Sequence, residues 1–345
     1  MEQSVTFPSG TVQYIFRQPI AEAVASWDEK HTILITNEHI AHLYPQLFRR
    51  LKTIVLPQGE ATKSLDTIAR LGRELLDAGA TRKTTLVGIG GGVITDIVGF
   101  AAATFMRGVR SGFVPTSLLG MVDAAIGGKN GVNVGMNKNI IGTIRQPSFI
   151  LYDPRFLDTL PDDEWSNGFA EIIKYACIFD APMFAALAAK SISDYKNGGD
   201  EAICSIIERC VPWKNKTVVE DEQEQGIRKL LNFGHTAAHA IENLYELPHG
   251  KAVAIGMVIA CMVSEQVTGL DSAATGQLKD MLCRYHLPVK LRINAIKAMD
   301  LLKMDKKRND DEIDYVVLEQ IGKGAIRTLP FDIVQQALSA YDSNH

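Results

Sequence analysis

The chain has 345 residues, enough for two domains or one large one. Hydrophobic residues make up 46% and charged residues 22%, which is ordinary for a globular protein with a sizeable core. The formal net charge of -4 gives no basic excess, so neither nucleic acid nor an anionic membrane is expected as the main partner.

The sequence carries no sign of export or of membrane insertion. Its N-terminus lacks a basic start followed by an apolar core, so no signal peptide is expected. The longest apolar stretch, 252–263, is too short to span a bilayer and contains Gly256. The five cysteines include no C-x-x-C pair and lie mostly in apolar helical segments. We therefore expect reduced, buried thiols in a cytoplasmic protein.

The first half of the chain alternates short β-branched runs with amphipathic patterns. In chain order these patterns predict strand 31–36, strand 53–56, helix 64–78, strand 84–89, helix 93–103 and strand 113–114. Strands that alternate with helices predict a parallel, doubly wound sheet. In such a sheet, ligands bind at the carboxyl ends of the strands.

Three consecutive glycines, Gly90, Gly91 and Gly92, stand at one such strand end and precede a helix. Glycines let backbone N–H groups approach a phosphate, and the helix N-terminus adds a positive dipole. The spacing lacks the full G-x-G-x-x-G signature, so a tight turn without a ligand is the alternative. A triple glycine is costly in chain entropy, which favours phosphate binding. Asp96, one turn into the helix, is placed either to cap locally or to bind a ribose or ring amide.

The segment 115–144 is rich in glycine and asparagine between apolar segments, a composition typical of a binding loop rather than a core. It contains the donors that a phosphorylated substrate needs: Lys129, Lys138, Asn133 and Asn139. A surface Ω-loop is the alternative. Arg107, just upstream, is either an anion ligand or a surface charge. Glu60 and Lys63, taken alone, are typical of a capping and solvated-charge role.

The second half is predicted to be mainly helical, with helices at 168–179, 202–210, 236–245, 252–268 and 272–285 and a strand-like run at 315–318. Glu171 and Lys174 are three residues apart on an otherwise apolar helix, so they are either paired with each other or functional. A second cationic group lies between Lys214 and Arg228, with Glu224 between them.

Three histidines surround one predicted helix. His235 and His239 are four residues apart and share a helical face, and His249 follows the next turn beside Gly250. Imidazoles in this arrangement form a reasonable ligand set for zinc or another divalent metal, lacking only a carboxylate. Glu171 is the best candidate for that carboxylate. Because no H-E-x-x-H pattern is present, surface or hydrogen-bonding histidines are the alternative.

Assembled in order, these motifs resemble the 3-dehydroquinate synthase family, within the sugar-phosphate cyclases, from about Thr32 to Gly324. The resemblance rests on P-x-G-E-x-x-K-S, G-G-G-V-x-x-D, F-M-R-G, P-T-S-L-L-x-M-V-D-x-x-I-G-G-K-x-G-V-N, A-E-I-I-K, R-x-L-L-N-F-G-H-T-x-x-H-A-I-E and H-G-x-A-V-A-I-G-M. It implies an NAD-binding α/β N-terminal domain with a parallel Rossmann-like sheet at residues 1–160. It also implies a mainly α-helical, metal- and substrate-binding C-terminal domain at 161–345, an active site between the domains, and a homodimer.

The resemblance also implies roles for individual residues. One divalent metal, most often zinc with cobalt as a possible substitute, would be held by Glu171, His235 and His249, while His239 would face the substrate phosphate. NAD would be held by Glu60, Lys63, Gly90, Gly91, Gly92, Asp96, Thr116, Lys129 and Lys138. The substrate phosphate would be bound by Lys129, Asn139, Arg107 from across the dimer, and Lys306 or Lys307. The substrate carboxylate would be bound by Lys214, Arg228 and Asn232, and the substrate hydroxyls by Asp123 and Lys174.

The implied reaction converts 3-deoxy-D-arabino-heptulosonate 7-phosphate to 3-dehydroquinate and phosphate in the shikimate pathway. Its steps are transient NAD-dependent oxidation, phosphate elimination, reduction, ring opening and intramolecular aldol closure. A sister cyclase acting on sedoheptulose 7-phosphate, a metal- and NAD-dependent polyol dehydrogenase and a non-enzymatic nucleotide-binding module are the alternatives. The chain departs from the usual family pattern at Asn37, Ala124, Ala125 and Lys251.

Overall fold

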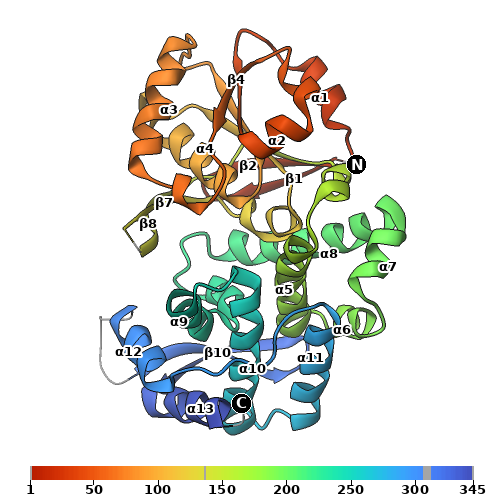
Figure 1. The fold of residues 1–345 in the computed structure, drawn as a ribbon, viewed down its shortest axis with the longest axis vertical. Helices are drawn as coiled ribbons and strands as arrows, with labels where there is room; N and C mark the ends of the chain where they lie inside the picture. The colour runs from red at the N-terminus through yellow and green to blue at the C-terminus, as the bar shows by residue number, and fades with distance from the viewer. Residues whose placement is uncertain (1, 136, 306–311, 344–345) are drawn as a thin grey trace. The chain divides into compact units, whose positions relative to one another are not determined.

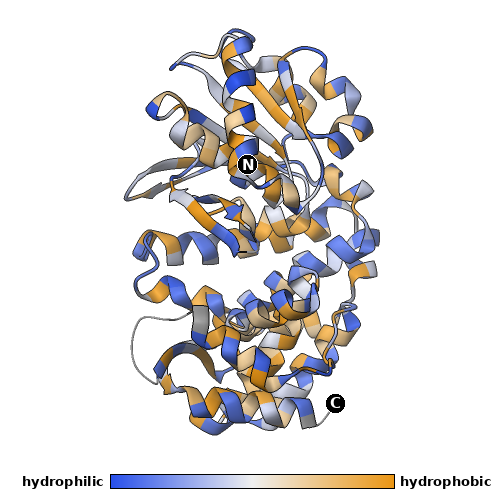
Figure 2. Cartoon of the chain, turned by 60° about the vertical axis from the view of Figure 1, so that its left-hand side comes forward, coloured by the Kyte–Doolittle hydropathy of each residue, from blue (hydrophilic) through white to orange (hydrophobic). Residues whose placement is uncertain are grey.

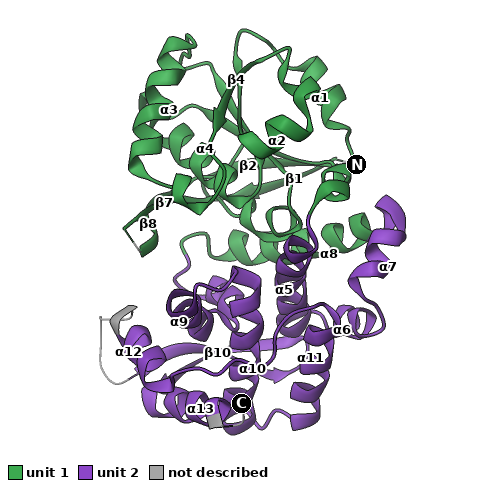
Figure 3. Ribbon diagram, in the orientation of Figure 1, with its two compact units in different colours: residues 1–160, 203–223 green, residues 161–202, 224–345 purple. Residues whose placement is uncertain are grey.

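The computed structural model of the chain describes residues 2–135, 137–305 and 312–343. The chain forms two compact units, Met1–Leu160 with Ile203–Gln223 and Pro161–Ala202 with Glu224–His345 (Figure 3). The chain therefore leaves the first unit, returns to it for about twenty residues, and leaves again. The predicted division at residue 160 did not include this return, because an amphipathic pattern does not reveal which unit its apolar face contacts.

A seven-stranded sheet with the order β1-β2-β9-β6-β5-β3-β4 is the centre of the first unit (Figure 1). Its strands are β1 (Glu2–Phe7), β2 (Gly10–Phe16), β3 (Thr32–Asn37), β4 (Lys52–Leu56), β5 (Thr85–Gly90), β6 (Arg110–Pro115) and β9 (Phe149–Tyr152). Only the β1–β2 pair of this sheet is antiparallel. The strand order reverses between β3 and β5, so the loops after these strands flank the crevice where such sheets bind ligands. The predicted α/β class with a parallel sheet is confirmed.

The helices of the first unit are α1 (Ile20–Ser26), α2 (Glu38–Leu43), α3 (Leu65–Asp77), α4 (Gly92–Thr104) and most of α8 (Gly199–Glu220). Of these helices, α2 and α4 pack directly against strands of this sheet. The side chain of Ser64 caps α3 by accepting from the N–H of Thr67, and Leu71 and Leu75 are buried on its inner face. Both hydrophobic and hydrophilic residues occur along most helices of the chain (Figure 2), which gives such helices an apolar face to bury.

The segment 115–144, predicted as an irregular binding loop, is largely regular. A π-helical turn (Gly120–Ala124) is followed by the antiparallel hairpin of β7 (Lys129–Val134) and β8 (Asn137–Ile144). The prediction was wrong here because glycine and asparagine, which are depleted in strands, interrupt the β-branched residues of both strands. Gly99 of α4 permits the contact with β7, since a Cβ there would lie 1.8 Å from Asn130 Oδ1.

The second unit is mainly helical, as predicted. It contains α5 (Asp162–Phe179), α6 (Ala181–Ala188), α7 (Ile192–Asn197), α9 (His235–Tyr245), α10 (His249–Val267), α11 (Ser272–Arg284), α12 (Ala295–Asp305), α13 (Phe331–Ser343) and the hairpin of β10 (Glu312–Gln320) and β11 (Lys323–Pro330). Helix α10 is central, because it packs against α5, α9, α11, α13 and β10.

By length and hydropathy alone, α10 is the one described helix that could cross a membrane. It is longer than the apolar stretch 252–263, so the sequence argument from length was wrong. However, 72% of its apolar window is buried inside the protein, as in the core helix of a soluble protein. Burial rather than length therefore explains its composition.

The described cysteines are all free thiols. Cys177, Cys204, Cys210 and Cys261 are buried, as predicted, whereas Cys283 is exposed on α11. The prediction of burial was therefore wrong for Cys283, which lies on the outer face of an amphipathic helix.

Candidate functional site

Three potential metal ligands meet inside the second unit. One donor atom from each of Glu171, His235 and His249 lies within 4.8 Å of the others. Glu171 Oε1 is 3.4 Å from His235 Nε2 and 3.5 Å from His249 Nε2, and the Glu171 side chain is fully buried. Donors bound tetrahedrally to zinc at ordinary bond lengths are roughly 3.4 Å apart. The carboxylate therefore already has the spacing to both imidazoles that a single ion requires.

Two glycines bring the helices that carry the histidines into backbone contact. Gly234 adopts a left-handed conformation (φ 78°) immediately before His235, the first residue of α9. Gly256 of α10 faces it, and a Cβ on Gly256 would lie only 2.0 Å from the Gly234 carbonyl oxygen. Because neither position tolerates a side chain, α9 and α10 approach more closely than ordinary helices do, and His235 comes near the start of α10.

Asn167 fixes the start of α10 relative to α5. Its Oδ1 accepts a 2.8 Å hydrogen bond from the N–H of Gly250, in the first turn of α10. A Cβ on Gly250 would lie 2.7 Å from the Asn167 Cα, so glycine is required for this contact. Asn167 lies one turn before Glu171 on α5. The same helix therefore supplies the carboxylate and holds the backbone next to His249.

Each histidine has a partner for its second ring nitrogen. His235 Nδ1 donates to the Phe233 carbonyl oxygen at 3.2 Å, and His249 Nδ1 lies 3.4 Å from Glu242 Oε2. In both rings, Nε2 is the nitrogen that approaches Glu171. A donor Nδ1–H leaves the Nε2 lone pair available for a metal ion.

The two imidazoles have opposite pKa shifts. Burial, assisted by the positive charge of Lys174, lowers the pKa of His235 to about 3. Burial also lowers the pKa of His249, but hydrogen bonds to the carboxylates of Glu171 and Glu242 outweigh it and raise that pKa to about 9. Lys174 forms an ion pair with Glu171 Oε2. At pH 7 these shifts favour a neutral His235 and a protonated His249, whose Nε2 must lose its proton before it can bind a metal ion.

His239 is not a member of this cluster of potential ligands. It is exposed on α9, and its ring centroid is 5.8 Å from that of His235 in an edge-on arrangement. The helical-face argument placed His239 beside His235 and named Glu171 as the missing carboxylate. The described cluster contains Glu171, 64 residues before His235, but not His239.

The triple glycine forms the turn between β5 and α4. Gly90 is the last residue of β5, Gly91 is the N-cap of α4, and the Gly90 carbonyl accepts from the N–H of Thr116 at 3.0 Å. A Cβ on Gly90 would lie 2.6 Å from Ile94, so packing alone requires glycine there. On Gly91 it would make only an ordinary 3.4 Å contact. Packing therefore does not explain the glycine at the N-cap, where a phosphate would approach.

Residues from three separate segments meet at Lys63. This lysine is only 5% exposed, and its Nζ donates at 2.6 Å to both Asp96 Oδ2 and Asn139 Oδ1. The Lys63 carbonyl accepts from the N–H of Asn133, whose Nδ2 donates to Glu60 Oε1 at 2.8 Å. Burial raises the pKa of Asp96 to about 6, although Lys63 acts to lower it. The sequence-based interpretation of Lys63 as a solvated charge was wrong.

Helix α8 brings Lys214 to Asp123, 91 residues away. Lys214 Nζ donates to Asp123 Oδ1 at 2.7 Å and to its backbone oxygen at 2.6 Å. The next residue, Asn215, accepts a buried 2.6 Å hydrogen bond from the hydroxyl of Tyr14 in β2. The N-terminal hairpin thus anchors the helix that presents Lys214.

The remaining predicted phosphate-binding cations, Lys129, Lys138 and Arg107, are exposed. Met106 and Arg107 both have left-handed backbones, with φ of 49° and 67°. Consecutive non-glycine residues in this region are strained, and such strain clusters at functional sites. The predicted Lys306 and Lys307 lie outside the described residues.

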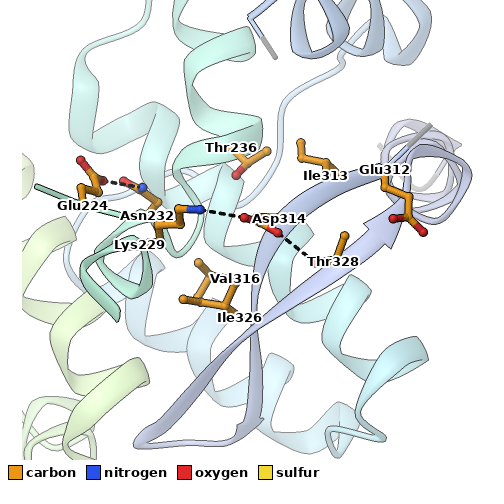
Figure 4. Close-up of a pocket in the computed structure, with 10 residues that line it drawn as sticks. All are labelled: Glu224, Lys229, Asn232, Thr236, Glu312, Ile313, Asp314, Val316, Ile326 and Thr328. Carbon is orange, nitrogen blue, oxygen red and sulfur yellow. Dashed lines mark hydrogen bonds and ion pairs between the residues drawn. The ribbon is translucent and has the colours of Figure 1, made fainter. Parts of the chain in front are cut away.

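A groove of about 480 Å³ in the second unit contains Asn232 (Figure 4). Asn232 Nδ2 donates to Glu224 Oε1 at 2.9 Å, and Lys229 pairs with Asp314 at 2.8 Å. Arg228, beside Lys229 in sequence, is 2% exposed. Sequence reasoning did not single out Lys229 or Asp314, which both line this groove.

Comparison with known proteins identifies the family. Family models described as 3-dehydroquinate synthase N-terminal and 3-dehydroquinate synthase C-terminal match residues 53–167 and 168–308. The 3-dehydroquinate synthase of Pyrococcus abyssi is 42% identical over 288 residues, which cover 83% of this chain and 84% of that protein. The chain belongs to the 3-dehydroquinate synthase family. The family member from Pyrococcus furiosus is 40% identical over 327 residues, which cover 92% of this chain and 95% of that protein.

Solved structures show the same fold. The 2-epi-5-epi-valiolone synthase from Streptomyces hygroscopicus subsp. jinggangensis, with NAD+ and Zn2+ bound, has 26% identity and a TM-score of 0.87 over 97% of each chain. A 2-deoxy-scyllo-inosose synthase complexed with carbaglucose-6-phosphate, NAD+ and Co2+ has 23% identity and a TM-score of 0.87 over 99% of this chain and 100% of the other. The matches confirm the predicted family and fold. They also confirm the prediction that this 3-dehydroquinate synthase family member is an enzyme of the phosphate-releasing lyase class.

Proposed function

We propose that the chain converts 3-deoxy-D-arabino-heptulosonate 7-phosphate into 3-dehydroquinate and phosphate, a carbon–oxygen lyase reaction of the shikimate pathway that leads to aromatic amino acids. The observation that carries this proposal is the identity of 40–42% to curated 3-dehydroquinate synthases over most of both chains. The two structurally similar cyclases with other products have only 23% and 26% identity. A sister cyclase activity on sedoheptulose 7-phosphate is therefore the weaker alternative.

One divalent cation, zinc or cobalt, is proposed at Glu171, His235 and His249. Two imidazoles and one carboxylate are a donor set of catalytic zinc sites, in which a fourth position stays open for water or substrate. The spacing of these donors and the direction of both Nε2 atoms fit such an ion. When bound, the cation supplies a Lewis acid for the C5 oxygen of the substrate, and NAD supplies a reversible hydride acceptor.

In the second unit, Lys174 and His239 are proposed to contact the substrate next to the cation. Lys174 is buried beside Glu171, so its ammonium is placed to bind a substrate hydroxyl. His239, exposed on α9, is proposed to face the substrate phosphate. Arg228 and Asn232 are proposed to bind the substrate carboxylate, because a guanidinium and an amide match its two oxygens.

In the first unit, the glycine turn and the N-terminus of α4 are proposed to hold the NAD pyrophosphate. The other residues proposed for NAD are Glu60, Lys63, Asp96, Thr116, Lys129 and Lys138. Lys129 and Asn139 are also proposed to bind the substrate phosphate, together with Arg107 of a second copy in a cytoplasmic homodimer. Lys214 and Asp123, paired with each other here, are proposed to bind the substrate carboxylate and a hydroxyl, respectively.

The protein's contribution to the chemistry is orientation and electrostatic stabilisation. We assign no described residue as a dedicated base for the C6 proton, and the departing phosphate of the substrate is proposed to accept it. The many cations and amides proposed to contact the substrate are consistent with a protein that orients the substrate while the substrate phosphate acts as the base.

Phosphate release from the heptulosonate phosphate tests the proposal. We expect release that depends on catalytic NAD+ and is abolished by a chelator, without net accumulation of NADH. Activity on sedoheptulose 7-phosphate alone would identify a sister cyclase, and stoichiometric NADH would identify a polyol dehydrogenase. Elution at twice the mass of the chain in light-scattering chromatography would support the homodimer.

A further inference from the structure

His249 lies between two carboxylates. Its Nε2 is 3.5 Å from Glu171 Oε1, and its Nδ1, on the other side of the ring, is 3.4 Å from Glu242 Oε2. The Glu242 side chain is only 10% exposed, so this carboxylate is held against the ring in a largely dry environment. Neither the metal set nor the substrate groups proposed above include Glu242.

The two histidines differ in the partner of their second nitrogen. For His235 that partner is the neutral carbonyl of Phe233, whereas for His249 it is the charged carboxylate of Glu242. A carboxylate partner makes a stronger hydrogen bond than a carbonyl and makes the imidazole a more basic ligand. It also fixes which nitrogen carries the hydrogen and therefore which one faces the ion.

We propose that Glu242 is a positioning residue of the metal centre, which orients His249 and strengthens its bond to a divalent cation. The inference rests on the proposed metal site at Glu171, His235 and His249. Helix α9 then has two roles, because it supplies one ligand at its first residue and, two turns later, the carboxylate that supports a ligand of α10.

The charges of the buried groups support the same role. With a divalent ion bound, the ion and the ammonium of Lys174 are opposed by the carboxylates of Glu171 and Glu242. Without Glu242, the buried site loses one of the two described carboxylates that contact His249 and oppose these positive charges. Because charges in such a site are weakly screened, loss of Glu242 reduces the affinity for the cation.

The test is metal affinity, measured by competition with a chromophoric chelator for Zn2+ and for Co2+. We expect Glu242→Gln, which keeps the shape and removes the charge, to bind either ion about 10–100-fold more weakly. Its Co2+ absorption bands should also change in position or intensity, because the His249 ring is no longer held. The matched control is Glu246→Gln, which removes the same charge from an exposed position at the end of α9 and should bind the ions like the wild type.

Folding is checked from the thermal unfolding of the metal-free proteins. Should Glu242→Gln fail to fold, Glu242→Asp retains the charge one methylene further from His249 and is expected to show a smaller loss of affinity. Wild-type affinity in a folded Glu242 variant, with the wild type releasing phosphate in a metal-dependent reaction, would overturn this inference alone. A wild-type protein that binds neither ion would overturn both the inference and the proposed metal site.

Discussion

Substitution of Gly256 by alanine tests whether the close contact between α9 and α10 builds the metal cluster. The new Cβ would lie 2.0 Å from the Gly234 carbonyl oxygen and 3.1 Å from the Ala238 nitrogen. Real Cβ atoms essentially never approach other atoms closer than 3.0 Å. The helices must therefore separate by about 1 Å or more, since backbone atoms cannot rotate away as a flexible side chain can.

That separation has two expected effects. Overpacking of this kind typically costs about 1–3 kcal/mol, and we expect Gly256→Ala to destabilise the protein by about 2 kcal/mol. His235 follows Gly234 directly, so a shift of about 1 Å exceeds the tolerance of about 0.2 Å in metal–ligand distances. We therefore also expect the affinity for zinc to fall at least about tenfold, by analogy with other losses of ligand support.

The assay compares denaturant unfolding and zinc affinity in Gly256→Ala and in a matched control. In Gly276→Ala the new Cβ would meet no atom within 4 Å, and Gly276 is also a helical glycine, in α11. This control should gain about 0.4–1 kcal/mol from the reduced freedom of the unfolded chain. If Gly256→Ala matched the control in stability and bound zinc like the wild type, the proposed role of the helix contact would be refuted.

Three further outcomes are expected. His235→Ala should lose both bound metal and phosphate release; a fully active, metal-containing variant would contradict the ligand assignment. Metal binding should release close to one proton at pH 7, because the pKa of His249 is about 9 in the metal-free protein and the bound imidazole must be neutral. Metal affinity should accordingly rise with pH up to about 9, and calorimetry in buffers of different ionisation enthalpy measures the proton; a pH-independent affinity would exclude it. Tyr14→Phe should destabilise the protein by about 1–3 kcal/mol in denaturant unfolding, because Asn215 loses its buried hydrogen bond, and an unchanged midpoint would contradict this.

The parts of the fold predicted from sequence have a clear local signal, which is an apolar stripe in α3 and a continuous apolar run in β5 and α4. Strand β5 and helices α3, α4 and α11 lie within about two residues of their predicted ranges, a typical boundary error. The N-terminal hairpin β1–β2 was missed because its first strand is mostly exposed and has no continuous apolar run. Helix α8 was predicted only from 202 to 210 because Pro212 interrupts the pattern, although the helix continues past it.

For the candidate site, too, spacing within one helix could be predicted from sequence, whereas contacts between separate elements could not. Local spacing pointed to α9, since the separation of His235 and His239 is a property of that helix alone. The partner from another helix, Glu171, depends on the packing of α5 and could be proposed only from its charge in an apolar segment. The burial of Lys63 among Asp96 and Asn139 depends on the β7–β8 hairpin, whose strands the sequence did not reveal.

The return of the chain through α8 bears on how this protein can be divided by gene engineering. A fragment that stops at residue 160 would lack Asn215, the partner of Tyr14, and Glu222, which accepts a 2.6 Å hydrogen bond from Ser9. Such a fragment would expose the surface that α8 covers and would be expected to aggregate. A soluble nucleotide-binding half requires residues 203–223 to be spliced behind residue 160, and chimaeras within the family need to exchange both pieces together.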